Sequence, residues 1–304
     1  MKGIAGNDPA NEKRVTVSVG IPAYNEEKMI GQLLEAILLQ PMNGIVLEEI
    51  IVNASGSTDG TEAKVADVAR VDSRVKLISK KERRGKASAL NAILRRANGD
   101  IRLFVDGDVI LGKDSIPNLI RPLLYDEEVG ISSGNVMPIT GKDGFFTFSS
   151  RFVRELHHRA CCHLISRGSV PKVDGTFYAI RKNVLKHFPL YVISDDEYAS
   201  WCAQRKGYKI VYKPKAVVYT KDPSSFKEFI KWQKRIITGQ LYMKRHFSYT
   251  VPTMKAPVTL ICFVRLVKKY PQRMLQILTL AALAGLSYLL ALITLLRNEV
   301  PYIY

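Results

Sequence analysis

Short apolar segments alternate with amphipathic segments along the first hundred residues of the chain. β-Strands are predicted for the apolar segments, which cover residues 15–22, 48–53, 75–79 and 101–105. Helices are predicted between them, at residues 26–39, 61–71 and 86–97. Strands that alternate with helices indicate parallel βαβ units, so we expect an α/β fold with a doubly wound sheet.

The pattern is less regular after Leu111. Helices are predicted at residues 145–166 and 196–205, and strands at residues 173–181 and 209–212. A doubly wound sheet binds its ligands beyond the carboxyl ends of its strands. The loops that follow the first, second and fourth strands cover residues 22–27, 53–60 and 106–108, and we expect the functional residues there.

The last eighty residues have an apolar and basic pattern. Residues 274–296 carry no charged side chain, and about 20 apolar residues are enough to cross a bilayer, so a transmembrane helix is predicted there. Residues 256–267 are apolar but too few to span, which leaves an interfacial and a re-entrant helix as alternatives. Residues 225–247 mix aromatic and basic side chains, which is typical of an amphipathic helix on a membrane surface.

These patterns divide the chain into five parts. They are a flexible N-terminus at 1–14, an α/β domain at 15–224, amphipathic interfacial helices at 225–273, a transmembrane helix at 274–296 and a short tail at 297–304. The N-terminus lacks the apolar run of a signal peptide. Basic residues gather before the predicted span and are few after it, so we expect the α/β domain on the cytoplasmic face of a membrane.

The composition narrows the class of protein. Hydrophobic residues make up 47% of the 304, which excludes an intrinsically disordered chain. The net charge of +17 suits a nucleic acid, an anionic membrane or a phosphorylated substrate. The basic residues are dispersed along the chain and become more frequent toward the predicted span, and no nucleic-acid-binding module is recognised. A membrane and a phosphorylated substrate are therefore the expected partners. The four cysteines match no zinc-ligand spacing and are interpreted as reduced, buried thiols.

Asp106 and Asp108 directly follow the fourth predicted strand. Alternate residues of an extended segment project to the same side, so the two carboxylates face a common space. Mg²⁺ is often held by one or two carboxylates together with substrate phosphates. The pair is therefore a candidate site for a metal bound to a diphosphate, although a polar turn would have the same residues.

Other polar groups lie at the same edge of the predicted sheet. Residues 25–27 follow the first strand, Asp59 lies after the second, and Lys86 opens the third helix. Each has an ordinary alternative as a helix cap, a turn or a solvated basic residue. Residues 194–197 add an acidic cluster at a helix start, where carboxylates that raise one another's pKa could supply a general base.

Five motifs, in order, resemble the inverting family-2 glycosyltransferases of GT-A fold, which include cellulose-synthase-like enzymes and polyprenol-phosphate sugar transferases. The motifs are PAYNEE, the STDGT loop, GKASALN, the aspartate pair after a strand, and DDE followed by RKGYKIVYKPKA. The resemblance extends from about Val15 to Thr220. It implies a metal-dependent enzyme that moves a sugar from a nucleotide-sugar to an acceptor, and the span predicted at 274–296 would anchor this enzyme to a membrane.

The resemblance also implies roles for individual residues. Asp106 and Asp108 would hold Mg²⁺ or Mn²⁺ against the donor diphosphate, and Asp196 would deprotonate the acceptor hydroxyl. The implied donor-binding residues are Pro22, Tyr24, Glu26, Ser55, Lys86, Asp106, Gly175 and Thr176. Gln233 and Arg235 are expected to contact the diphosphate or the acceptor.

Two departures from the family pattern bear on specificity. Many members have two acids before GSTD, where this chain has Ala54 and Ser55. Polymer-forming members carry Gln-x-x-Arg-Trp, but here Arg235 follows Gln233 at a different spacing and no Trp follows it. With one predicted span, these departures favour transfer of a single sugar over polymer synthesis.

The sequence leaves several functions open. The preferred hypothesis is transfer of mannose from GDP-mannose to a polyprenol-linked or other lipid acceptor in the assembly of a glycan precursor, such as that of N-glycans. UDP-glucose or UDP-N-acetylglucosamine is the alternative donor, and a non-catalytic membrane adaptor that keeps the fold is a further alternative. A nucleotidyltransferase is disfavoured because the segment after the first strand is acidic instead of glycine-rich and basic.

Overall fold

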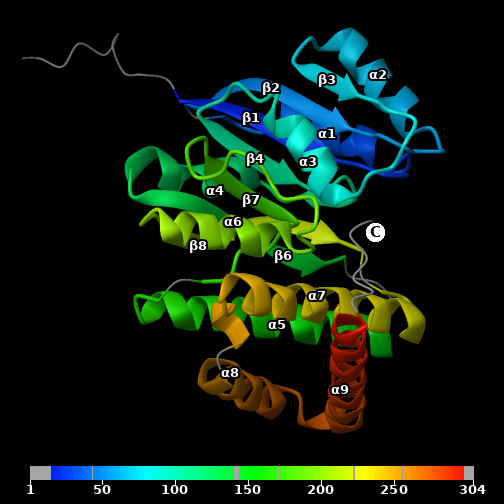
Figure 1. The fold of residues 1–304 in the computed structure, drawn as a ribbon, viewed down its shortest axis with the longest axis vertical. Helices are drawn as coiled ribbons and strands as arrows, with labels where there is room; N and C mark the ends of the chain where they lie inside the picture. Colours follow the sequence, from blue (N-terminus) through cyan, green and yellow to red (C-terminus); the bar gives the residue numbers. More distant parts are fainter. Residues whose placement is uncertain are drawn as a thin grey trace, which may run out of the picture.

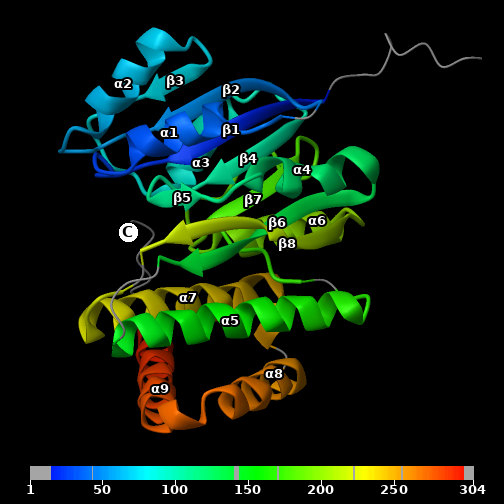
Figure 2. The same cartoon turned by 180° about the vertical axis from the view of Figure 1, so that it is seen from behind.

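The computed structural model describes residues 15–297, apart from 43, 140–143, 170, 222 and 255. The predicted flexible N-terminus at 1–14 and all but the first residue of the predicted tail at 297–304 lie outside the described residues. An eight-stranded mixed sheet with the order β3-β2-β1-β4-β7-β6-β8-β5 forms the centre of the described chain. Helices cover both faces of this sheet, as Figures 1 and 2 show, so the expectation of an α/β, GT-A-like fold is confirmed.

The N-terminal half of the sheet is parallel, as the alternating pattern predicts. Its strands are β1 (Thr16–Pro22), β2 (Val46–Asn53), β3 (Val75–Ile78) and β4 (Ile101–Val105). They are connected by α1 (Ile30–Leu38), α2 (Thr61–Val71) and α3 (Lys86–Leu94). Two of the three helices are shorter than predicted. Because the strands are parallel, their carboxyl ends meet at one edge of the sheet.

The C-terminal half of the sheet differs from the sequence-based expectation. Three elements were not predicted: β5 (Val109–Leu111), α4 (Ser115–Tyr125) and β6 (Val129–Pro138). β7 (Phe177–Arg181) pairs antiparallel with β4 and is shorter than predicted, whereas β8 (Lys209–Thr220) is much longer. Polar residues interrupt the hydrophobic pattern of β6, yet Ser132 and Ser133 are buried by tertiary packing. Local pattern alone therefore could not identify this strand.

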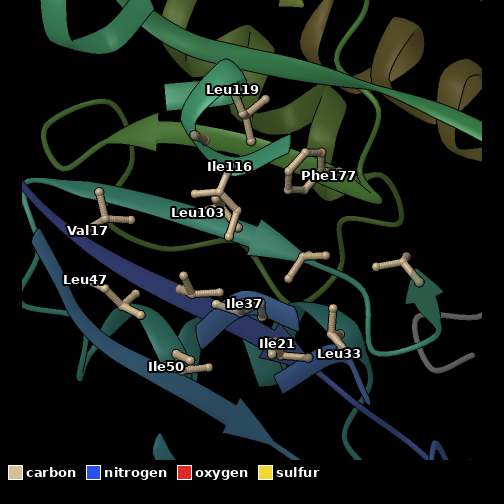
Figure 3. Close-up of a cluster of buried hydrophobic side chains, with 14 of the residues drawn as sticks. Val17, Ile21, Leu33, Ile37, Leu47, Ile50, Leu103, Ile116, Leu119 and Phe177 are labelled. Carbon is tan, nitrogen blue, oxygen red and sulfur yellow. The ribbon is translucent and has the colours of Figure 1, made fainter. Parts of the chain in front are cut away.

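Two hydrophobic clusters hold the helices to the sheet. Alternate residues of β1 and β4 face α1 and α4, where Val17, Leu103 and Leu119 belong to one cluster (Figure 3). Phe104 points to the opposite face and packs in the second cluster with residues of α3 and of α6 (Asp195–Arg205). This alternation fixes which strand residues are buried on each side. It also fixes the position at which the loop after each strand begins.

A second helical region lies beyond the sheet. α5 (Phe145–Ser166) and α7 (Phe226–Phe247) form a layer between the sheet and two further helices, α8 (Ala256–Lys269) and α9 (Met274–Leu296), as Figure 1 shows. Phe152 of α5, Phe229 of α7, Leu266 of α8 and Ile277 of α9 meet in one apolar cluster. α5 thus packs with the helices that follow residue 224.

One helix of the described chain, Pro271–Leu296, is long and apolar enough to cross a membrane by length and composition. Leu275, Leu278 and Leu289 are exposed on it, as lipid-facing side chains would be. α9 occupies the range predicted for the transmembrane helix.

Candidate functional site

A cavity of about 490 Å³ opens at the carboxyl ends of β1, β2 and β4. Nine residues that the sequence singled out line it together: Pro22, Tyr24, Glu26, Ser55, Lys86, Asp106, Gly175, Thr176 and Asp196. Asp108 also lines it. Residues separated by up to 174 positions in the chain therefore share one cavity, which we name the donor cavity.

Lys86 joins the acidic residues of the donor cavity. Its Nζ lies 2.8 Å from Asp106 Oδ1 and 3.7 Å from Asp195 Oδ1, and it donates a hydrogen bond to the Gly175 carbonyl. Gly85 precedes Lys86 with a φ of 79°, a conformation that favours glycine, so the Gly-Lys pair starts α3 at this place. Burial lowers the pKa of Lys86, but Asp106 and Asp195 outweigh burial and raise it. Lys86 is therefore a permanent cation.

The loop before β7 connects the aspartate pair to the candidate base. Asp106 N donates to the Thr176 carbonyl, and Gly175 N donates to Asp196 Oδ2 at 3.2 Å. A side chain on Gly175 would meet the Asp196 carboxyl carbon at 3.3 Å, so this close approach depends on glycine. Burial raises the pKa of Asp196, which makes its carboxylate a stronger base than an exposed one.

Of the acids after β1 and β2, only Glu26 lines the donor cavity. Burial raises the pKa of Glu26 to about 7, and the charges of Asp108 and Asp106 act in the same direction. Glu27 instead accepts a hydrogen bond from Gly60 N, and Asp59 accepts from Glu27 N and Thr61 N. These hydrogen bonds hold the two loops together, so Glu27 and Asp59 have a structural role.

One end of the donor cavity combines an aromatic ring with unsatisfied polar groups. The Arg83 guanidinium carbon lies 3.6 Å from the centre of the Tyr24 ring, a stacking contact that the sequence did not reveal. Ser55 Oγ is buried and has no hydrogen-bond partner among the described residues. A planar, polar group such as a nucleobase suits such a surface.

α7 closes the donor cavity from the helical region. Arg235 lines it together with Trp232, whereas Gln233 does not line it. Burial raises the pKa of Asp106, and the charges of Lys86 and Arg235 oppose this rise, which indicates that the Arg235 guanidinium faces the aspartate pair. Trp232 precedes Arg235 by three positions, and helical residues three apart share a face. The sequence did not identify Trp232, although this spacing was a usable signal.

Three further charged groups were missed by the sequence reasoning. Arg154 of α5 forms an ion pair with Asp174 at 3.1 Å, and Lys172 Nζ lies 4.0 Å from Glu197 Oε1. Lys172 and Asp174 shortly precede the predicted Gly175, whereas Arg154 is one of several basic residues in its helix and gave no local signal. Burial raises the pKa of Glu197 to about 8, and its Oε2 has no hydrogen-bond partner among the described residues.

Asp106 and Asp108 are the residues that could hold a divalent cation. Within residues 15–297, outside the gaps named above, no three His, Cys, Asp or Glu side chains are grouped so that they could bind a metal alone. The charges of Asp108 and Asp106 both raise the pKa of Glu26, so the three carboxyl groups interact. Two carboxylates completed by phosphate oxygens are a normal Mg²⁺ arrangement, so the residues fit a metal that arrives with a diphosphate.

Comparisons with known proteins bear on the family of the chain. The model of the family described as "Glycosyltransferase like family 2" matches residues 14–239. A poly-β-1,6-N-acetyl-D-glucosamine synthase of Staphylococcus aureus is 24% identical over 259 residues, 81% of this chain. A probable glycosyltransferase of Bacillus subtilis, YdaM, is 27% identical over 76% of the chain. The chain spans 60% and 56% of the lengths of these relatives.

Solved structures share the fold. The mannosyltransferase PcManGT from Pyrobaculum calidifontis, in complex with GDP-mannose and Mn²⁺, has a TM-score of 0.63 and 24% identity over 94% of this chain and 88% of that one. Glucosyl-3-phosphoglycerate synthase from Mycobacterium tuberculosis, with Mn²⁺ and UDP, has a TM-score of 0.52 and 22% identity over 76% of this chain and 78% of that one. At these identities the likeness shows the fold alone.

Proposed function

The chain belongs to glycosyltransferase family 2, and from this premise we propose that it transfers a single mannose from GDP-mannose to a lipid-linked acceptor at a membrane surface. One observation carries the proposal. Lys86 joins Asp106 of the aspartate pair to Asp195 of the acidic cluster within a single cavity that Asp196 also lines. One end of the cavity therefore suits the diphosphate of a bound donor, and the basic carboxylate of Asp196 lies within reach of the same donor.

The proposed reaction is an in-line displacement. Asp196 accepts the proton of the acceptor hydroxyl, the hydroxyl oxygen bonds to the anomeric carbon, and the bond from that carbon to the diphosphate breaks with inversion. A bound Mg²⁺ or Mn²⁺ at Asp106 and Asp108 would neutralise charge on the leaving diphosphate. Lys86 and Arg235 add fixed positive charge beside the same position.

The Asp196 carboxylate is held in place for this role. Oδ2 accepts from Gly175 N and Oδ1 accepts from Glu197 N. Burial and the nearby carboxylate of Asp174 favour its protonation, while Lys172 and Lys86 oppose this effect. The group is thus oriented by backbone donors and is more basic than an ordinary aspartate, as a general base requires.

The base of the donor is proposed from the end of the cavity near Tyr24. Ala54 and Ser55 replace two acids found in many relatives, and Ser55 Oγ is buried without a partner among the described residues. A hydroxyl that can donate and accept suits the edge of guanine. UDP-glucose or UDP-N-acetylglucosamine is the second candidate donor, because a relative is named an N-acetylglucosamine polymer synthase and one neighbour was solved with UDP.

A lipid-linked acceptor is proposed from the position of the helical region. Trp232 and Arg235 of α7 line the donor cavity, and α7 packs against α9, the candidate membrane span. An acceptor with a lipid tail would reach the cavity from that side. The departure from the Gln-x-x-Arg-Trp motif supports transfer of one sugar instead of polymer synthesis. We also propose that the α/β domain lies on the cytoplasmic face of the membrane.

Calorimetric titration of the detergent-purified chain tests the proposal. GDP, UDP, GDP-mannose, UDP-glucose and UDP-N-acetylglucosamine are titrated with Mn²⁺ and again with EDTA. We expect GDP and GDP-mannose to bind only with Mn²⁺. Mn²⁺-dependent binding of UDP alone would overturn the choice of donor, and no binding to folded protein would favour the adaptor function.

A further inference from the structure

A second cavity of about 750 Å³ lies between α5 and α8, and none of its lining residues lines the donor cavity. Met137 of β6 contributes to its wall, and the remaining lining residues belong to α5, α8 and Tyr270. We name it the α5–α8 cavity. The proposed sugar transfer uses no residue of this cavity, so its presence calls for a separate explanation.

The α5–α8 cavity carries an excess of positive charge. Its lining includes the four cationic side chains Arg151, Arg159, Arg265 and Lys269. Glu155 is the acidic residue in the lining, and it accepts from Arg159, Lys269 and the Tyr270 hydroxyl. A single carboxylate therefore compensates one of four cations.

His158, which also lines the cavity, is engaged with a neighbouring ring. Its Nδ1 lies 2.8 Å from the Tyr212 hydroxyl. Burial, with the neighbouring charge of Arg159, lowers the pKa of His158 and so disfavours its charged form. The guanidinium and ammonium groups therefore carry the main positive charge of the cavity.

The cations converge from two helices. Arg159 of α5 and Arg265 of α8 both counteract the effect of burial on the pKa of the Cys262 thiol, which lies in the cavity wall. Two guanidinium groups from different elements thus act on the same point. Guanidinium groups bind phosphate oxygens with paired hydrogen bonds, so this arrangement suits a phosphate group.

Apolar side chains line part of the cavity and are exposed on the same helix that supplies Arg265. Met137, Cys162, Cys262 and the Tyr270 ring provide apolar wall. On α8 itself, the apolar side chains Leu260, Ile261 and Val264 are exposed, and α9 follows with exposed leucines. A ligand that combines a phosphate with a hydrocarbon tail would match both parts of this surface.

We propose that the α5–α8 cavity binds the phosphate headgroup of an anionic membrane lipid, whose tails lie along the exposed apolar side chains of α8. Arg151, Arg159 and Arg265 face the headgroup, and Glu155 keeps its bonds to Arg159 and Lys269. The bound lipid would fix α8 against α5 at the membrane surface. This proposal does not depend on the chemistry at Asp106 and Asp196.

The test is titration of the detergent-purified full chain with dihexanoyl phosphatidylglycerol, dihexanoyl phosphatidylcholine and inorganic phosphate, followed by native mass spectrometry and thermal shift. The paired variant Arg151→Gln/Arg265→Gln removes two cavity cations. Lys268→Gln is the matched control, because Lys268 is exposed on the same helix and does not line the cavity. Binding of GDP and UDP is measured in parallel to show that each variant is folded.

We expect phosphatidylglycerol to bind and stabilise the chain, with affinity at least tenfold lower in the paired variant and changed less than twofold in Lys268→Gln. Nucleotide binding should be equal in all three proteins. If the paired variant and the control lost equal affinity for phosphatidylglycerol, binding would depend on diffuse surface charge and the proposal would be wrong. Equal binding of phosphatidylcholine, or inorganic phosphate binding as well as the lipid, would also overturn it.

Discussion

The two cavities of this chain use charge in different ways. The donor cavity contains a short-range, shielded ion pair, Arg154–Asp174, whose side chains are 12% and 15% exposed. In the α5–α8 cavity four cations face one carboxylate of the lining, Glu155, and Lys269 is 48% exposed. A shielded pair has a fixed position, whereas exposed cations are screened by salt.

This difference separates two tasks. A reaction needs groups whose position and protonation are set before the substrate arrives, because reorganisation during the reaction raises the barrier. Binding to a membrane surface needs positive charge that many headgroups can satisfy, each residue contributing about 1 kcal/mol. Substitutions in the donor cavity should therefore have larger effects than those in the α5–α8 cavity.

The largest effect is expected from Asp108→Asn. The loss of one carboxylate from the aspartate pair removes several kcal/mol of stabilisation from the leaving diphosphate, so turnover should fall by about 10³-fold or more. Sugar transfer and Mn²⁺-dependent nucleotide binding are measured for both proteins. Asp67→Asn, an exposed carboxylate on α2, is the control. Normal turnover in Asp108→Asn would contradict the metal assignment.

The next effect is expected from Asp196→Asn, which keeps the shape of the side chain but cannot accept the proton. Turnover should fall by about 10²- to 10⁴-fold, as is typical for loss of a general base. Binding of the nucleotide should remain nearly intact, because Asp106, Asp108 and Lys86 are unchanged. The measurement is kcat beside a nucleotide titration, and equal losses in both would point to a binding role.

Arg154→Gln tests whether shielding matters to the ion pairs. The substitution leaves the Asp174 carboxylate buried without its guanidinium partner, so the free energy of unfolding should decrease by about 3–5 kcal/mol. Chemical denaturation in detergent gives this value. The double variant Arg154→Gln/Asp174→Asn should recover part of the loss, and no recovery would contradict direct pairing.

Glu197→Gln tests the raised pKa of a buried carboxyl. Because the pKa is about 8 in the folded chain and near 4.5 in the unfolded one, protonated Glu197 is favoured by folding, and stability falls as pH rises between these values. Each unit of the shift corresponds to about 1.4 kcal/mol. The variant should therefore lose stability less steeply than the native chain from pH 5 to 8 in thermal unfolding. Parallel pH profiles would exclude a raised pKa.

The smallest effect is expected from Lys269→Ala in the α5–α8 cavity. Its ion pair with Glu155 is half exposed, and Glu155 keeps Arg159 and Tyr270 as partners. The free energy of unfolding should change by less than about 1 kcal/mol. If Lys269→Ala lowered the free energy of unfolding as much as Arg154→Gln does in the same denaturation experiment, the proposed difference between the two cavities would be wrong.

The regular half of the fold was predictable because its elements are determined locally. β4 and α2 have the predicted bounds, because a run of buried apolar residues and an amphipathic repeat can each be recognised from the local sequence. β6 was missed because its polar residues become buried only when β7 and β8 pair with it. β8 was truncated for a related reason, since its pattern of lysine and proline does not resemble a strand.

The candidate site was predictable where a motif follows an element. The strand end at Asp106, the helix start at Lys86 and the acidic cluster at Asp196 were assigned from sequence, and the structure brings them into one cavity. Arg154 could not be assigned, because it comes from a helix whose place beside the sheet depends on long-range packing.

The sequence by itself determined the strand-to-helix alternation, the order of the motifs and the apolar helix at 274–296, since these depend on residues close together in the chain. The tertiary structure alone decided which acids face the donor cavity, that Glu27 and Asp59 each accept a backbone hydrogen bond from the other's loop, and that α5 and α8 enclose a cationic cavity. Contacts between distant segments carry no local pattern, and burial and pKa follow from those contacts.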